Sequence, residues 1–268
     1  MKKLLPWLLP FITGTLLIAA WYGIGHLYGQ TVSYTSQRIM IPFPHEIIQA
    51  GISEREILWK STLQTLKAAV FGFLAAVGAG YVIAMVLSSA VWVKQALYPW
   101  VLVLQMTPVV ILAPIFVIWM GQGLPSITAI TFMIGFFPVV ANTTMGLVST
   151  DPNLIDLYRV CNASRMQEIC SLRVPYAMPY FLTGLKIAGT LAPIGAITGD
   201  IFAGASANGV GGIGFMTIVY KAQLKIDALY ATAFVACILG FIFVGCVNLL
   251  HWFLLKNWHE SMIPQNKR

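Results

Sequence analysis

The distribution of charged residues constrains this chain more than any other feature. No Asp, Glu, Lys or Arg occurs in residues 4–37, 68–93, 95–150, 201–220 or 228–255. A helix that crosses the hydrocarbon core of a bilayer needs roughly 20 apolar residues, so the stretch 95–150 is long enough for two crossings and a turn. Charged residues make up only 9% of the 268 positions, whereas an ordinary soluble domain carries about 25%. The chain is therefore an integral membrane protein and not a water-soluble globule.

The same stretches predict an all-α membrane fold. Strands of a membrane barrel alternate apolar and polar residues, and none of these stretches does so. The apolar run after Met1 is longer than the core of a signal peptide, so we expect it to be retained as the first helix. We predict a single domain over 1–268, with its core at 60–256 and a turn at Gly121–Pro125. The six expected spans lie at about 6–27, 65–88, 97–119, 126–147, 182–203 and 228–254.

The basic residues predict the orientation of these spans. An even number of spans places both termini on one side, and cytoplasmic termini leave ten Lys and Arg residues inside and six outside. Cytoplasmic loops carry such an excess in membrane proteins. The excess of Lys and Arg in the cytoplasmic loops accounts for the net charge of +7. The sequence has no basic patch with interleaved aromatic residues, so it does not indicate a nucleic-acid partner.

Small residues and prolines within the spans predict how the helices pack. Gly72, Ala76, Gly80 and Ala84 repeat at every fourth position, a stripe that lets helices approach closely in lipid. The stripe can serve packing within the bundle or a contact between subunits. We expect four prolines to interrupt their helices within the membrane. We also expect these helices to line a cavity, because interrupted backbone in a membrane needs hydrogen-bond partners from protein or water. The four prolines are Pro108, Pro114, Pro138 and Pro193.

Ionisable groups within the membrane are few. Asp200 is the one carboxylate inside a predicted span, and it can act in a gate or pathway or can anchor the outer loop through backbone amides. Proton-coupled transport needs several such groups along a path. No HExxH motif, paired carboxylates or Ser/His dyad indicates an enzyme, and the four cysteines lack metal-ligand spacing. We therefore predict no catalytic residue, no metal site and no self-powered transport.

The outer segments carry two local patterns. Ser53 with Glu56 three residues later predicts a capping box that opens a polar helix. Gly209–Gly214 matches GxGxxG, but the dinucleotide fingerprint requires a preceding strand. We interpret this stretch as an outer loop or as the backbone of a gate, within a Gly-rich and then polar segment at 204–227.

The polar loop at 148–181 carries the strongest functional pattern. It predicts a short helix, a break at Asn162, which tolerates the left-handed conformation, and a second helix. Ser164 with Gln167 forms a capping box that opens the second helix. A short exposed helix held between two spans is suited to contact a cytoplasmic partner.

This loop resembles the E-A-A-x-x-x-G loop of bacterial ABC-importer permeases of the binding-protein-dependent type. Asp156 stands at the Glu, Leu157 and Tyr158 at the two Ala, and Asn162 at the Gly, so all four depart from the motif. The likeness rests on the surrounding residues and extends over nearly the whole chain. It includes Ala163-Ser164, Val174-Pro175 with Pro179, Gly184–Ala188, Asp200, Pro108, Trp119–Gly121 and Phe136–Thr143. Together these resemble the nitrate/sulfonate/taurine subfamily, which also contains thiamine-precursor and riboflavin permeases.

The resemblance implies a type I ABC-importer permease fold in a bacterial inner membrane. It implies a homodimer, two cytoplasmic ATPase subunits that bind ATP and Mg²⁺, and an extracytoplasmic solute-binding protein, with no cofactor in this chain. The residues expected to contact the ATPase are Asp156, Leu157, Tyr158, Arg159, Asn162, Ala163 and Ser164. The candidates for the pathway or gate are Met106, Pro108, Phe136, Asn142 and Asp200.

The resemblance leaves the substrate open among small polar solutes. The tail Trp258–Ser261 is more similar to the pyrimidine-precursor and riboflavin branch than to the sulfonate branch. The alternative function is a secondary transporter or channel that works without partners.

Overall fold

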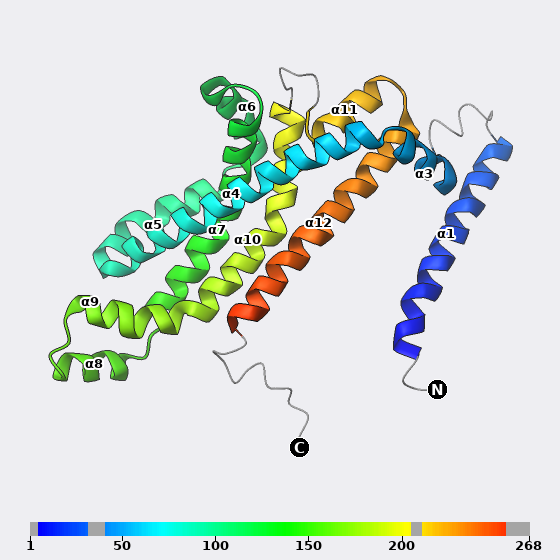
Figure 1. Ribbon diagram of the computed structural model, residues 1–268. Coiled ribbons are helices and arrows are strands. Elements are labelled where there is room, and N and C mark those ends of the chain that lie inside the picture. Colours follow the sequence, from blue (N-terminus) through cyan, green and yellow to red (C-terminus); the bar gives the residue numbers. More distant parts are fainter. Residues whose placement is uncertain (1–4, 32–40, 205–210, 256–268) are drawn as a thin grey trace.

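The computed structural model describes residues 5–31, 41–204 and 211–255, and these residues form helices and connecting turns without a strand (Figure 1). The transmembrane-length helices are α1 (Leu5–Thr31), α4 (Arg55–Ser89), α7 (Leu124–Val148), α10 (Val174–Ala203) and α12 (Ile226–Leu255). The shorter helices of the described residues are α3 (Pro44–Ser53), α5 (Val91–Met106), α6 (Val109–Met120), α8 (Pro152–Val160), α9 (Arg165–Glu168) and α11 (Ile213–Ala222). A π-helical turn, Ile169–Arg173, joins α9 to α10.

The third predicted span is a broken helix. The predicted interruption at Pro108 is confirmed, because the span expected at 97–119 consists of α5 and α6, which meet at an angle of 95°. Thr107 between them is extended, with φ −72° and ψ 123°, because a residue before a proline is disfavoured in the helical conformation. Pro108 also lacks an N–H group for a continuous helix. Among the described residues, five helices are long and apolar enough to cross a membrane, and there are six candidate spans when this bent pair is counted as one.

The other three prolines do not interrupt their helices. Pro114, Pro138 and Pro193 lie inside α6, α7 and α10, so the prediction of breaks at these positions is wrong. Neighbouring helices and polar side chains can satisfy the backbone groups that a proline frees, and a helix then continues through it.

The core of the bundle consists of α4, α7 and α10, which pack through small residues. A Cβ atom added to Gly80 on α4 would lie 2.9 Å from Val139 Cβ on α7, and one added to Gly135 on α7 would lie 3.2 Å from Ala76 Cβ. Ala76 and Ala84 are fully buried. Of the two interpretations of the stripe, packing within the chain is therefore confirmed.

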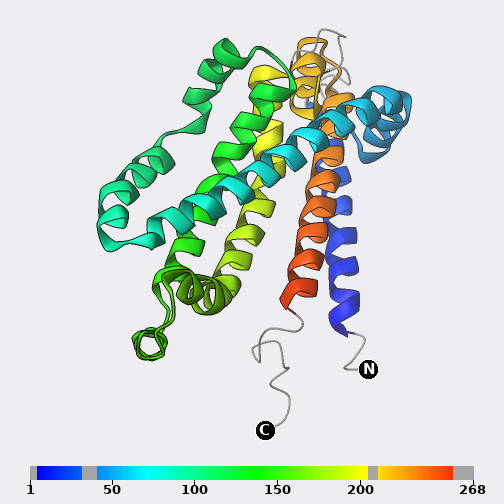
Figure 2. The same ribbon diagram turned by 60° about the vertical axis from the view of Figure 1, so that its left-hand side comes forward.

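The two ends of the bundle carry different elements. The start of α1, the end of α12 and helix α8 lie at one end, and α3 and α11 lie at the other (Figures 1 and 2). This arrangement agrees with an even number of spans. Helix α1 joins the bundle near α3, where Trp21 Nε1 donates to the Pro42 carbonyl at 3.1 Å and its ring stacks on Phe234.

The helices at the end of the bundle opposite α8 differ from the sequence-based expectation. The predicted capping box at Ser53 and Glu56 is wrong, because Ser53 is the last residue of α3 and its hydroxyl donates to the Gln49 carbonyl at 3.0 Å. Helix α3 instead begins at Pro44, where the Phe43 N–H donates to Glu46 Oε2 at 3.0 Å. Residues 213–222, which lie in the segment described from the sequence only as Gly-rich and then polar, form α11.

Candidate functional site

Helix α8 projects from the end of the bundle on the polar loop. It begins at Pro152, and the Asp151 carboxylate before it accepts a hydrogen bond of 2.9 Å from the Asn153 N–H. No residue of α8 is buried. The side chains of Leu157 and Val160 are 55% and 80% exposed. Helix α8, which lies between the long helices α7 and α10 in the chain, therefore has apolar side chains that no other part of the described chain buries.

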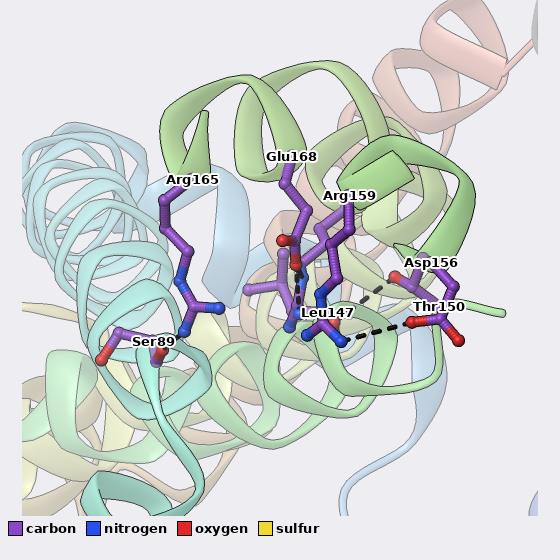
Figure 3. A network of polar contacts seen from close by, with 8 residues as sticks. Ser89, Leu147, Thr150, Asp156, Arg159, Arg165 and Glu168 are labelled. Carbon is purple, nitrogen blue, oxygen red and sulfur yellow. Dashed lines mark hydrogen bonds and ion pairs between the residues drawn. The ribbon is translucent and has the colours of Figure 1, made fainter. Parts of the chain in front are cut away.

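The residues predicted to contact a partner lie on α8 and on the turn after it. Asp156, Leu157, Tyr158 and Arg159 lie on α8, and the Arg159 guanidinium lies 3.2 Å from the Asp156 carboxylate in an exposed ion pair (Figure 3). The remaining three, Asn162, Ala163 and Ser164, form the connection to α9. The structure thus brings all seven together in one continuous segment.

The geometry of this connection confirms two sequence predictions. Asn162 has a left-handed φ of 52°, a conformation in which Asn is better tolerated than most residues. The Ser164 N–H donates to Gln167 Oε1 at 2.7 Å, and the Gln167 N–H donates to Ser164 Oγ at 3.3 Å. This reciprocal capping box opens α9 and fixes the direction in which the chain leaves α8.

Two contacts made by residues of the loop are not predicted from the sequence, and Figure 3 shows Glu168, Arg165 and Ser89 among the residues that form them. Arg173 forms an ion pair with the buried Glu168, its Nε donating to Oε1 at 2.7 Å. Arg165 donates from Nη2 to the Ser89 carbonyl at the end of α4 at 2.7 Å. The π-helical turn explains the first contact, because its wider winding brings together residues five positions apart.

The pathway candidates do not form one cluster. Met106 is 81% exposed at the end of α5, and Pro108 follows it at the break. Phe136 and Asn142 both lie on α7, where the Phe136 ring packs against Phe132 at 5.1 Å between centroids. Among the described residues, no hydrogen bond or ring contact joins the five candidates to one another. Their role in a pathway remains a prediction.

Asp200 holds the start of α11. Its carboxylate is fully buried, and Oδ2 accepts hydrogen bonds from Thr65 Oγ1 at 2.5 Å and from the Gly214 N–H at 3.3 Å. Thr65 Oγ1 in turn accepts from the Ile213 N–H at 2.8 Å. The first amides of a helix lack intrahelical partners, and these contacts satisfy two of them. These contacts are those expected if Asp200 anchors the outer segment through backbone amides. A role of Asp200 in a gate or pathway remains a prediction.

The GxGxxG motif at Gly209–Gly214 ends at Gly214, whose N–H donates to Asp200. Gly209 and Val210 lie outside the described residues, while Gly211 and Gly212 precede α11 directly. The nearest element before it in the described part of the chain is the membrane helix α10 rather than a strand. Among the residues that the structure describes, the strand that a dinucleotide site requires before the motif is therefore absent.

Helix α11 is also fixed at its other end. Tyr220 donates from its hydroxyl to Glu54 Oε2 at 3.2 Å, and Lys225 Nζ lies 2.8 Å from Glu54 Oε1. Burial, followed by the nearby Glu54 carboxylate, raises the pKa of Tyr220 above its ordinary range. The phenol therefore stays protonated and remains a donor to Glu54 at neutral pH.

The comparisons with known proteins agree with this architecture. The family of binding-protein-dependent transport system inner membrane components matches residues 70–256. The formylaminopyrimidine transport permease protein ThiX of Halalkalibacterium halodurans is 30% identical over 97% of this chain and 100% of its own length. The riboflavin transport system permease protein RibX of Chloroflexus aurantiacus is 34% identical over 55% of each chain. The nitrate import permease protein NrtB of Leptolyngbya laminosa is 28% identical over 81% of this chain and 72% of its own. This chain belongs to the family of binding-protein-dependent transport system inner membrane components, the permeases of ABC importers.

Proposed function

We propose that this permease forms the gated substrate pathway of an ATP-driven importer and is coupled to a separate ATPase through α8. The observation that carries the proposal is the exposure of α8, which presents Leu157 and Val160 outside the bundle. The Asp151 cap begins the helix, and its end is closed by the bond of the Ala163 N–H to the Tyr158 carbonyl, directly before the Ser164 capping box opens α9. A force applied to α8 is therefore passed to α7 and α10.

The permease itself supplies a path and transmits motion. Two ATPase subunits bind ATP and Mg²⁺ and contact α8, and a solute-binding protein docks at the opposite end, near α3 and α11. When the ATPases close, the two copies of α8 move together. The continuous helical rod from Arg165 to Ala203 carries this displacement to Asp200 and α11. Both termini then lie in the cytoplasm, and the membrane is the bacterial inner membrane.

A second copy of the chain covers the broken span. Backbone that leaves the helical conformation at membrane depth must be buried in protein or face a water-filled path, because lipid satisfies no hydrogen bond. The break at Thr107 and Pro108 is such a place, and α5 has no buried residue within one chain. A homodimer that meets along α5 and α6 shields this break and encloses the pathway.

The transported solute is a small polar heterocycle of the formylaminopyrimidine or riboflavin type. The similarity to the formylaminopyrimidine permease covers nearly the whole of both chains, and the similarity to the nitrate permease is lower and covers less. The binding protein sets the final selectivity. Thermal-shift screening of that protein against formylaminopyrimidine, riboflavin, taurine and nitrate identifies the solute.

Energised uptake tests the proposal against a transporter that works without partners. Vesicles that contain the permease, its ATPase and its binding protein should accumulate solute with ATP, and an uncoupler should leave this uptake unchanged. Uptake that persists without ATP and stops with the uncoupler would contradict the proposal. The Ala163→Trp variant, which crowds the turn after α8, should hydrolyse ATP without uptake.

A further inference from the structure

Arg165 connects the loop that carries α8 to the end of α4. It is the first residue of α9, and its Nη2 donates to the carbonyl of Ser89, the last residue of α4, at 2.7 Å (Figure 3). The two residues are 76 positions apart in the sequence. The contact therefore joins the loop that carries α8 to the end of a second transmembrane helix.

The Ser89 carbonyl is well suited to accept this bond. The last carbonyls of a helix have no intrahelical donor, and the C-terminal end carries a partial negative charge. A guanidinium donor makes the bond charge-assisted. Arg165 is exposed, so solvent competes for both partners and the bond adds little to overall stability. Such a contact can break and re-form without unfolding the protein.

The helix that follows Ser89 is not packed into the core of its own chain. Ala90 is extended, with φ −153° and ψ 150°, and α5 begins at the next residue. No residue of α5 is buried. Its far end is Met106, beside the 95° break at Pro108. A displacement of the α4–α5 turn is therefore passed along α5 to the break, where two pathway candidates lie.

We propose that Arg165 is a positioning residue that transmits the displacement of the α8 loop to α5, and through α5 to the break at Pro108. This inference rests on the proposed coupling of α8 to an ATPase. The rod from Arg165 to Ala203 moves α11 at one end of the bundle, and the bond from Arg165 to Ser89 moves α5 with it. One ATPase contact thereby drives both arms of the pathway together.

The first test compares three variants in vesicles that contain the complete complex. Arg165→Gln removes the charge-assisted bond, Arg165→Lys retains a cationic donor, and Lys94→Gln removes a neighbouring positive charge on α5 that makes no bond to the loop. We expect Arg165→Gln to lower solute uptake per ATP hydrolysed about fivefold, as the loss of one weak bond predicts. Arg165→Lys should recover most of the coupling, and Lys94→Gln should match the wild type.

A purely structural role for Arg165 would give a different result. It would lower the melting temperature and the yield of assembled complex, and we expect neither to change in Arg165→Gln. Wild-type coupling in Arg165→Gln, or an equal loss in Lys94→Gln, overturns the inference. Failure of the proposed function is seen separately, as a wild-type complex that shows no ATP-dependent uptake, and that result overturns both.

A distance measurement tests the transmitted motion directly. Spin labels at the exposed positions Val103 on α5 and Ile187 on α10 report the movement of α5 against the rod, in a variant whose native cysteines are replaced by serine. Trapping the ATPase with vanadate should shift this distance in the otherwise wild-type chain, and Arg165→Gln should abolish the shift. An unchanged shift in Arg165→Gln contradicts the inference.

Discussion

Thr65 on α4 and Asp200 on α10 form a hydrogen bond of 2.5 Å between fully buried side chains 135 positions apart. Together they hold the N–H groups of Ile213 and Gly214 at the start of α11. Three helices thus meet at one buried polar contact. The position of α11 depends on it, because a buried amide left without a partner is costly.

Thr65→Val should destabilise the protein by about 2–4 kcal/mol, because it leaves the Ile213 N–H unsatisfied and removes a donor from Asp200. Thr65→Ser keeps the hydroxyl and should lose only about 1 kcal/mol through the deleted methyl group. Denaturant unfolding in detergent measures both values. Equal losses in the two variants would show that the hydroxyl is not what holds α11.

Gly80→Ala should destabilise the α4–α7 contact by about 1–3 kcal/mol through overpacking, because the new Cβ would meet Val139. Gly78 lies two positions earlier on the same helix, and a Cβ there meets nothing within 4 Å. Gly78→Ala is therefore the matched control and should be neutral or stabilising by up to about 1 kcal/mol, because Ala favours a helix over Gly. Thermal unfolding distinguishes them, and similar effects would contradict the packing described for the stripe.

Glu168→Ala should destabilise the protein by about 3 kcal/mol, because it leaves the largely buried Arg173 guanidinium without its carboxylate partner. Asp156→Ala breaks the exposed pair with Arg159 and should change stability by less than about 1 kcal/mol. Unfolding measurements on the two variants compare these contacts. A large loss in Asp156→Ala would show that α8 is more tightly packed than its exposure indicates.

Local patterns explain most of what could be predicted from the sequence. Four charge-free stretches indicate five of the six spans, while the remaining span, at 182–203, contains Lys186 and Asp200. The turn after α8 depends on Asn162 and Ser164, whose conformations follow from their nearest neighbours. The break at Pro108 lies inside a run without charged residues, so hydropathy does not indicate it, and its prediction depended on the proline itself. Ser53 followed by Glu56 fits a capping box. Ser53 does not cap a helix, however, because α3 begins at Pro44 and still includes Ser53.

The contacts that fix the site in space could not be predicted in this way. Arg165 and Ser89, like Thr65 and Asp200, lie far apart in the sequence, and a single sequence does not indicate which distant residues meet. The pair Glu168 and Arg173 has a spacing that an ordinary α-helix does not bring together. It forms because the chain winds into a π-helical turn at 169–173.

Site-specific photo-crosslinking from α8 tests the central claim most directly. A photoreactive phenylalanine analogue at Leu157 should crosslink to the ATPase subunit in intact membranes, and the same group at the exposed Ile48 on α3, at the opposite end, should not. The Asp156→Lys variant should weaken the Leu157 crosslink and lower the uptake of solute per ATP. A Leu157 probe that reacts with no ATPase in a membrane that still shows ATP-dependent uptake would contradict the assignment of α8 as the coupling helix.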